Sequence, residues 1–242
     1  GPGSGRVRGF LAAAGGGGRG ANARVVTAPQ GMVLAPGGAF TLFGGTCAHC
    51  LGAQAATLDS FYIDRTEVTV EAYRAYAKAA GATIPAYIAA DGQFPMTHIM
   101  WPEAETYCRT RDSLTRLPTE QEWEASARGK GGRVYPWGND WDKTRANAAG
   151  AVGRTVAVGS FAGGASEGGA LDMAGNAWEW TSTPGPLTSD GRRQYIIRGG
   201  AFDTPPEQAT MYFRSMLPEA VAGNERLKYY DKTGFRCMRR LR

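Results

Sequence analysis

The part of the chain that follows Gly129 lacks any helical periodicity, and this absence restricts the fold more than any other feature of the sequence. It consists of turns, short apolar runs and aromatic motifs, among them YPWGNDWD, LDMAGNAWEW, YIIRGGAF and TGFRCMRR. The whole chain contains 35 glycines and 6 tryptophans, which is typical of an irregular backbone held in place by large aromatic side chains. We therefore expect a loop-rich fold of mixed type and not a helical bundle.

Short strands are predicted ahead of that region. Residues 31–44 alternate apolar and small residues around Pro36-Gly37-Gly38 and predict two strands joined by a turn, which we interpret as a hairpin. Residues 61–63 predict another strand. The sequence contains no internal repeat, so we assign residues 31–242 to one domain.

Three helices are predicted from their end signals. The first begins after Thr69, a capping residue, and ends at Gly81. The second opens with Pro102, because proline fits the first turn of a helix. The third follows Thr119, which has a glutamate at capping-box spacing, and ends at Gly129. One face of the first helix is expected to contain Tyr73, Tyr76, Ala77 and Ala80.

Residues 1–30 are predicted to lie outside the fold. GPGS resembles the remnant of a cleaved tag, and the Gly/Ala-rich run after it has too few large apolar groups to pack. We interpret this run as a flexible leader that suits a tether to a membrane anchor or a larger chain. No apolar run approaches the roughly 18 to 20 residues of a membrane span, and no signal peptide is visible.

Several functional classes are disfavoured by charge and motif content. The net charge is +5, but Lys and Arg are scattered and the only dense cluster is at residues 236–242, so we predict no nucleic-acid partner. The two histidines lie in no nucleophile-like setting, which argues against a hydrolase triad. The run GGGGRG lacks the strand-loop-helix context of a phosphate-binding loop.

Taken in order, the motifs resemble those of the formylglycine-generating enzyme family, also called the sulfatase-modifying factor family, from about residue 31 to residue 239. The matching stretches are GMVLAPGGAFTLFG, FYIDRTEVTVEAYRAY, RLPTEQEWEASARG, YPWGND, LDMAGNAWEW, RGGAF and GFRCMRR. The resemblance implies an α+β fold of the C-type-lectin-like kind, with a small twisted antiparallel sheet, two or three helices and extensive ordered loops. That scaffold serves oxidases, ligand binders and hypervariable recognition proteins, so the fold alone does not give the function.

The motif LDMAGNAWEW carries a metal hypothesis. Calcium-binding members of the family build a site around this motif, and calcium takes six to eight oxygen ligands. Carried over position by position, the ligands would be Asp172, Gly175, Ala177 and Glu179. The alternative is a turn at Gly175-Asn176 that the two tryptophans of the motif anchor in the core, and both interpretations stay open. A second calcium site near Asn147 lacks its acidic partner and is predicted to be lost.

The copper chemistry of the family depends on a cysteine pair just beyond the Arg-Gly-Gly motif, because soft Cu(I) requires thiolates. Here the matching stretch is AFDTPPEQAT, with Thr204 and Ala209 at or near the two positions. The resemblance therefore predicts a member without bound copper and without the copper-dependent reaction. Ergothioneine-type sulfoxide synthases share the resemblance, but their iron site depends on a separate helical domain that we do not expect here.

Four cysteines remain to be explained. By resemblance, Cys108 and Cys237 match a structural disulfide that ties the second helix to the last strand and implies an oxidising compartment. Cys47 and Cys50 form the motif CAHC around His49. This motif is either a small loop disulfide, a redox dithiol or half of a metal site; haem attachment is excluded because Leu51 follows the second cysteine.

The stretch from Arg198 to Met216 is the predicted binding surface. Arg198 and Phe202 are interpreted as scaffold because both belong to the family motif, whereas residues 203–210 are expected to form an exposed variable loop. Arginines and aromatic residues on irregular backbone commonly dominate binding surfaces. The predicted binding residues are Asp203, Thr204, Glu207, Gln208, Tyr212 and Arg214.

These observations predict a non-catalytic, extracytoplasmic binding or assembly module for a protein or peptide partner. The alternative is a divergent metal- or thiol-dependent oxidase in which CAHC or acidic residues act. A third option is a glycan binder of the C-type-lectin kind, although the sequence has no separate acidic sugar-binding motif.

Overall fold

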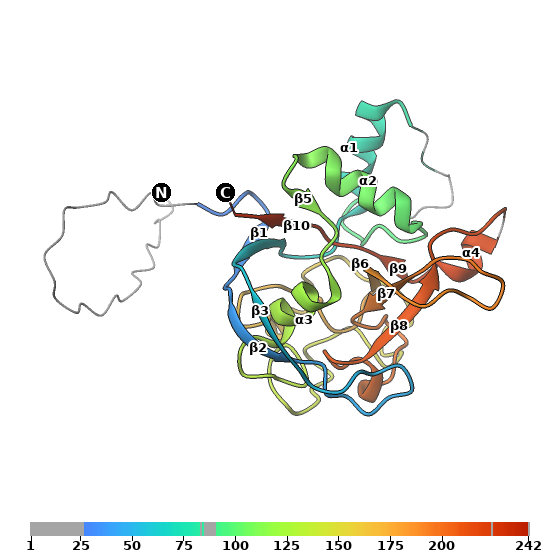
Figure 1. The fold of residues 1–242 in the computed structure, drawn as a ribbon. Helices are drawn as coiled ribbons and strands as arrows, with labels where there is room; N and C mark the ends of the chain where they lie inside the picture. Colours follow the sequence, from blue (N-terminus) through green and yellow to red (C-terminus); the bar gives the residue numbers. More distant parts are fainter. Residues whose placement is uncertain (1–26, 83, 85–90, 224, 242) are drawn as a thin grey trace, which may run out of the picture.

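The computed structural model describes residues 27–82, 84, 91–223 and 225–241, and these form two four-stranded sheets and one hairpin (Figure 1). The first sheet has the order β1 (Met32–Ala35), β4 (Phe61–Asp64), β10 (Met238–Arg240) and β5 (Thr115–Arg116). The second has the order β8 (Arg214–Pro218), β7 (Gln194–Arg198), β6 (Trp178–Pro184) and β9 (Thr233–Gly234). The hairpin consists of β2 (Gly38–Leu42) and β3 (Gln54–Leu58).

The two strands predicted in residues 31–44 exist, but they do not pair with each other. β1 is antiparallel to β4, with Val33 opposite Ile63, and β2 is antiparallel to β3. The chain turns a corner at Gly37, where an added Cβ would lie 2.5 Å from the backbone nitrogen of Ser60. The turn therefore leads from one sheet to another, and the predicted hairpin is wrong.

The three predicted helices are present, with α1 and α3 at the predicted bounds and α2 beginning one residue before Pro102. α1 (Val70–Ala80) is capped by Thr69 and ends at Gly81, whose φ is +67°. α2 (Trp101–Arg111) has its proline in the first turn. α3 (Glu120–Arg128) has a complete capping box with Thr119. The five-residue helix α4 (Glu225–Tyr229) and the two short 3₁₀ turns, η1 (Ala162–Gly164) and η2 (Pro206–Gln208), were not predicted.

The larger core lies where α1 and α2 cover the first sheet (Figure 1). Tyr73 of α1 stacks on Tyr107 of α2, with ring centroids 5.6 Å apart, and Tyr107 meets Phe235 edge to face. Trp180 of β6 is fully buried and donates from its indole nitrogen to the carbonyl of Ile99 at 2.9 Å. Aromatic packing therefore joins the helices to both sheets.

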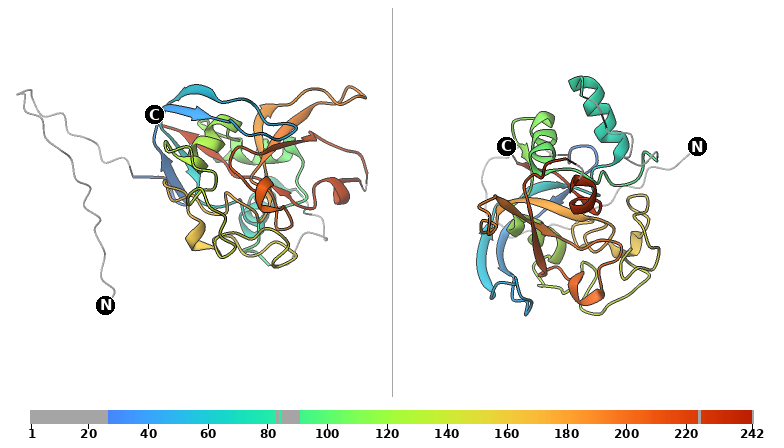
Figure 2. Two further views of the ribbon diagram at one scale, coloured as in Figure 1. Left: turned by 90° about the horizontal axis from the view of Figure 1, so that it is seen from below. Right: turned by 90° about the vertical axis from the view of Figure 1, so that its right-hand side faces the viewer.

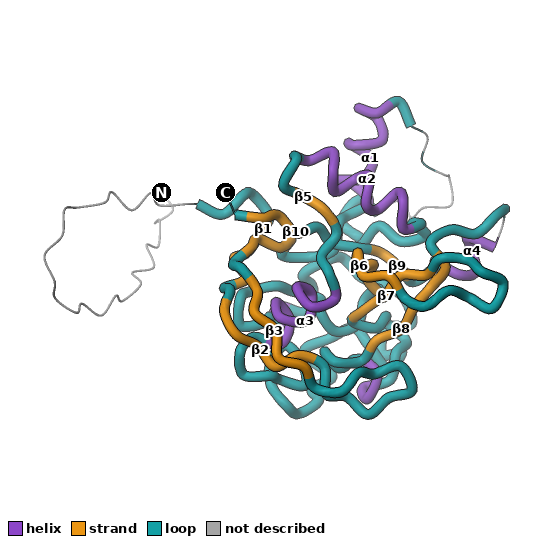
Figure 3. Tube along the Cα trace, in the orientation of Figure 1, coloured by secondary structure: helices purple, strands orange, loops and turns teal. Residues whose placement is uncertain are grey.

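Loops make up most of the remaining described chain (Figure 3). Two further views place the β2–β3 hairpin on one side of the molecule and the loops of residues 150–170 on the opposite side (Figure 2). These features confirm the α+β class with extensive ordered loops, while the parallel pairing of β6 with β9 departs from a purely antiparallel sheet. The predicted leader falls mostly on residues 1–26, which lie outside the described residues. No helix in the described ranges has both the length and the apolar character to cross a membrane.

Candidate functional site

The predicted binding stretch begins inside the protein. Arg198, at the end of β7, has a fully buried side chain that pairs with Glu120 and Glu124 of α3. Its Nη2 also donates to the carbonyl of Met211, at 2.5 Å. One guanidinium therefore joins a strand, a helix and the far end of the loop, which agrees with its interpretation as scaffold.

The two glycines after Arg198 allow the sharp turn that begins the loop of residues 201–213. Gly199 and Gly200 have φ values of +93° and +80°, a region that side chains with a Cβ rarely adopt. An added Cβ at Gly200 would lie 2.9 Å from Cγ2 of Thr204, so the chain folds closely back on itself here.

The two positions that the resemblance matches to the family's cysteine pair are interior. Thr204 is buried, and its Oγ1 accepts from the backbone nitrogen of Ala201 at 2.8 Å. Ala209 is fully buried, and its backbone nitrogen donates to the carbonyls of Pro205 and Pro206. A hydroxyl used as a structural acceptor and a methyl group replace two thiolates, and neither binds soft metals.

The expectation that residues 203–210 form an exposed loop is only partly correct. Asp203, Glu207 and Gln208 face solvent, and Asp203 pairs with Lys232 at 2.5 Å. Thr204 is buried because the tight turn at Gly200 directs it inward, so it is not available at the surface.

Tyr212 and Arg214 are half-buried by contacts within the chain. Arg214 donates from its Nε and Nη2 to the two carboxylate oxygens of Glu120, at 3.0 and 2.6 Å. The guanidinium carbon of Arg128 lies 5.8 Å from the centroid of the Tyr212 ring. Both residues border the solvent-facing part of the loop, and each has a fixed orientation.

The CAHC segment closes over this same stretch, a relationship that the sequence analysis missed. Cys47 and Cys50 form a disulfide in the loop between β2 and β3, which reaches the start of β8 (Figure 1). The Sγ of Cys50 lies 3.7 Å from the carbonyl oxygen of Tyr212, and Arg214 donates to the carbonyl of His49 at 3.4 Å. The partners are more than 160 residues apart in the chain, so no local pattern could have joined them.

The second disulfide, between Cys108 and Cys237, is present as the resemblance implied. Cys108 lies in α2 and Cys237 directly precedes β10, and both side chains are fully buried. It therefore ties the helical layer to the strand that carries the end of the chain.

The predicted calcium positions surround a buried ion pair. Glu179 accepts from the Nε and Nη2 of Arg236, each at 2.6 Å, and from the indole nitrogen of Trp123 at 2.7 Å. Both carboxylate oxygens thus accept hydrogen bonds, and a calcium ion at these positions would have to compete with Arg236 for Glu179. Across the described ranges, no group of three or more His, Cys, Asp or Glu side chains is placed to hold a metal ion. Calcium at Asp172, Gly175, Ala177 and Glu179 stays a prediction.

Asn176 explains much of the motif's role as a turn. Its φ is +63°, and its side-chain amide donates to Glu67 at 2.9 Å and accepts from Asn147 at 3.1 Å. Burial raises the pKa of the Glu67 carboxyl well above its ordinary value, and the carboxylates of Asp172 and Glu179 raise it further. Burial also raises the pKa of Asp172, whose Oδ2 accepts from the backbone of Gly159 at 2.6 Å. The motif thus organises a buried polar network.

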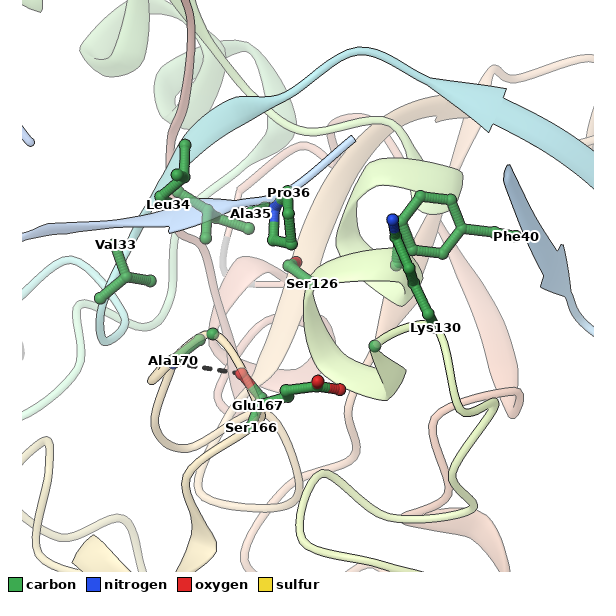
Figure 4. Close-up of a pocket in the computed structure, with 14 residues that line it drawn as sticks. Val33, Leu34, Ala35, Pro36, Phe40, Ser126, Lys130, Ser166, Glu167 and Ala170 are labelled. Carbon is green, nitrogen blue, oxygen red and sulfur yellow. Dashed lines mark hydrogen bonds between the residues drawn. The ribbon is translucent and has the colours of Figure 1, made fainter. Parts of the chain in front are cut away.

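An apolar pocket of about 200 Å³ lies beside α3, away from the loop (Figure 4). Apolar groups from β1, β2 and α3 line it, including Val33, Ala35, Phe40 and Ala125, while Lys130 and Glu167 supply charged groups. None of its lining residues belongs to the stretch from Arg198 to Met216. Its size suits one apolar side chain better than a drug-sized ligand.

Comparisons with known proteins identify relatives of this chain. Inactive C-alpha-formylglycine-generating enzyme 2 of Bos taurus is 34% identical over 165 residues, which cover 60% of this chain and 50% of that protein. Hercynine oxygenase of Mycobacterium tuberculosis is 42% identical over 141 residues, which cover 50% of this chain and 32% of that protein. The chain thus spans half or less of the length of these two curated relatives.

The fold recurs in the structure of PvdO from Pseudomonas aeruginosa, with a TM-score of 0.70. The match covers 87% of this chain and 94% of that chain at 24% identity, which shows the fold alone. The sulfatase-modifying factor enzyme 1-like domain family matches residues 19–241. The sequence resemblance is thereby confirmed, and this chain belongs to the sulfatase-modifying factor enzyme 1-like family.

Proposed function

We propose that the chain is a non-catalytic binding or assembly module, with a protein or peptide partner that docks on residues 202–214. The observation that carries the proposal is the burial of Thr204 and Ala209. By the family resemblance, these two residues stand where the copper-binding thiolates would be, and here both make structural contacts instead. A relative named an inactive formylglycine-generating enzyme supports the idea that the scaffold is used without that reaction.

The docking surface combines aromatic and charged groups on a rigid support. Phe202, which we interpreted as scaffold, is only half-buried, as is Phe213, so both rings can also border the surface. The Nζ of Lys232 lies 5.6 Å from the centroid of the Phe202 ring. Glu207 and Gln208 face solvent on η2. The buried Arg198 anchors both ends of the loop, so binding here would lose little conformational entropy. Preorganised aromatic groups with a polar rim suit a peptide surface.

The location proposed is extracytoplasmic. The two disulfides support it, because such bonds persist in oxidising compartments and are rare in the cytosol.

A photo-cross-linking amino acid at Gln208 tests the proposal. The matched control carries the same group at Ser189, which is exposed on the connection between β6 and β7, at the opposite end of these strands. We expect a discrete adduct from Gln208 and none from Ser189 in extracytoplasmic extract. Equal labelling from both positions would contradict a specific surface at residues 202–214.

A Cu(I) titration of the oxidised protein tests the absence of the family's reaction. The two disulfides occupy all four cysteines, so we expect no stoichiometric binding against a competing chelator. Stoichiometric Cu(I) together with conversion of a cysteine peptide would favour the oxidase alternative.

A further inference from the structure

The two disulfides have opposite settings. Cys108 and Cys237 are fully buried and 129 residues apart. Cys47 and Cys50 are half-buried on a loop, three residues apart, with the exposed His49 between them. A disulfide that closes a small ring constrains the unfolded chain less than one that closes a large ring, so the CAHC bond is the one that the fold can open without collapse.

The loop stays closed at its base when the bond opens. The backbone nitrogen of Gly44 donates to the carbonyl of Leu51 at 3.0 Å, just outside the two cysteines. The β2–β3 ladder continues from this point, with Leu42 opposite Gln54. The reduced thiols therefore remain close enough to close again.

The two sulfurs differ in their surroundings. The Sγ of Cys50 faces the carbonyl of Tyr212 at 3.7 Å. A Cβ added to Gly45 would lie 2.3 Å from Cδ2 of Tyr212 and 2.8 Å from this sulfur, so the tyrosine ring and the backbone of Gly45 enclose Cys50. We expect these neighbours to obstruct direct attack on the Sγ of Cys50, so that an incoming thiolate reacts with the Sγ of Cys47.

We propose that Cys47–Cys50 is an exchangeable disulfide, open to cysteine thiols of a protein docked on Tyr212 and Arg214. The partner thiolate attacks the Sγ of Cys47, the bond between the two sulfurs breaks, and Cys50 leaves as a thiolate. A second partner thiolate attacks the mixed disulfide and releases Cys47 as a thiolate. The partner dithiol loses two electrons and becomes a disulfide, while CAHC gains two electrons and becomes a dithiol, with its protons taken from solvent.

The partner in this step rests on the proposed function, whereas the exchange itself does not. Glutathione therefore serves as the probe, without any partner. The oxidised protein is equilibrated in graded mixtures of reduced and oxidised glutathione, quenched with N-ethylmaleimide and mapped by mass spectrometry. We expect Cys47 and Cys50 to be alkylated together and reversibly, while Cys108–Cys237 and the circular dichroism spectrum stay unchanged.

Single-cysteine variants test which sulfur is accessible to exchange, because the remaining thiolate attacks oxidised glutathione and releases reduced glutathione. Cys50→Ser leaves Cys47 to react with oxidised glutathione, and Cys47→Ser leaves Cys50 as the matched control. We expect mixed disulfide to form more than about tenfold faster in Cys50→Ser, with the difference abolished when Tyr212→Ala is added to both. Equal rates with Tyr212 present, or reduction of both disulfides only on global unfolding, would overturn the proposal. Exchange with glutathione but no adduct from Gln208 would remove the partner and leave the exchange intact.

Discussion

Arg198 and Glu124 form an ion pair in which neither side chain is exposed to solvent. Removing one member of such a pair leaves a buried charge without its partner and typically costs about 3–5 kcal/mol of stability. We therefore expect Arg198→Met to lower the free energy of unfolding by about 3 kcal/mol in urea titrations, the lower end of this range, because Arg128 still pairs with Glu124 at 2.7 Å. The control is Arg109→Ala, which removes a pair whose arginine is 59% exposed and should cost at most about 1 kcal/mol. Equal losses in the two variants would contradict the role given to Arg198.

The disulfides should differ in their effect on stability. In the chain-entropy model, removing the bond that spans 129 residues costs about 5 kcal/mol, whereas removing the CAHC bond costs about 2 kcal/mol. We expect Cys108→Ala/Cys237→Ala to lower the thermal midpoint much more than Cys47→Ser/Cys50→Ser does. Differential scanning calorimetry measures both, and the reverse order would show that the loop bond carries the fold.

Gly175 is expected to tolerate no side chain. Its φ is +82°, and an added Cβ would lie 2.2 Å from the carbonyl oxygen of Asn147. Strain and clash together should make Gly175→Ala cost more than about 2 kcal/mol. Gly131→Ala is the control, because nothing lies within 4 Å of its added Cβ and its φ lies outside the strained range. A cost for Gly175→Ala no larger than that of the control would refute the close approach.

Asp112 should contribute stability that is lost in acid. A hydrogen bond from Arg239 is the main cause that lowers the pKa of this carboxyl from its ordinary value of 3.8 to about 2. A lowered pKa in the folded state means that the contribution is present above about pH 4 and is lost as the pH falls toward 2. The carboxylate is partly exposed, so solvent screening keeps the effect below about 1 kcal/mol. The difference in unfolding free energy between the parent and Asp112→Asn should shrink over this interval, and a constant difference would contradict the prediction.

The effect of calcium on thermal stability tests the metal hypothesis for the LDMAGNAWEW motif. Arg236 holds both carboxylate oxygens of Glu179, and a metal there must displace it. We expect the thermal midpoint to be the same in calcium chloride and in EGTA. A clear rise with calcium would support the ligand set predicted from the sequence and would require Glu179 to turn away from Arg236.

Local signals predicted the helices well. Thr69 and Thr119 cap α1 and α3, and both helices end at a glycine, because a cap depends on only a few neighbouring residues. The hairpin assigned to residues 31–44 was wrong for the converse reason. The partner of β1 is β4, and the corner at Gly37 is set by Ser60, which no pattern within residues 31–44 encodes.

The site was only partly predictable. Arg198 was interpreted as scaffold because it belongs to the family motif, and its buried ion pairs with Glu120 and Glu124 agree with that role. The burial of Thr204 depends on the backbone conformation of Gly200, and the packing of Cys50 on Tyr212 depends on a loop 162 residues away. Both are consequences of tertiary structure that composition and spacing do not contain.

The bond from α2 to the residue before β10 also determines what a break in the backbone would do. The disulfide between Cys108 and Cys237, which are 129 residues apart, closes the chain between them into a covalent ring. This ring includes α3 and most of the irregular loops. A protease that cuts after Leu187, whose side chain is 63% exposed, opens this ring without releasing a fragment. Residues 188–242 would stay attached through this disulfide, so a nicked molecule would gain only the mass of one water and would separate into fragments once the disulfide was reduced.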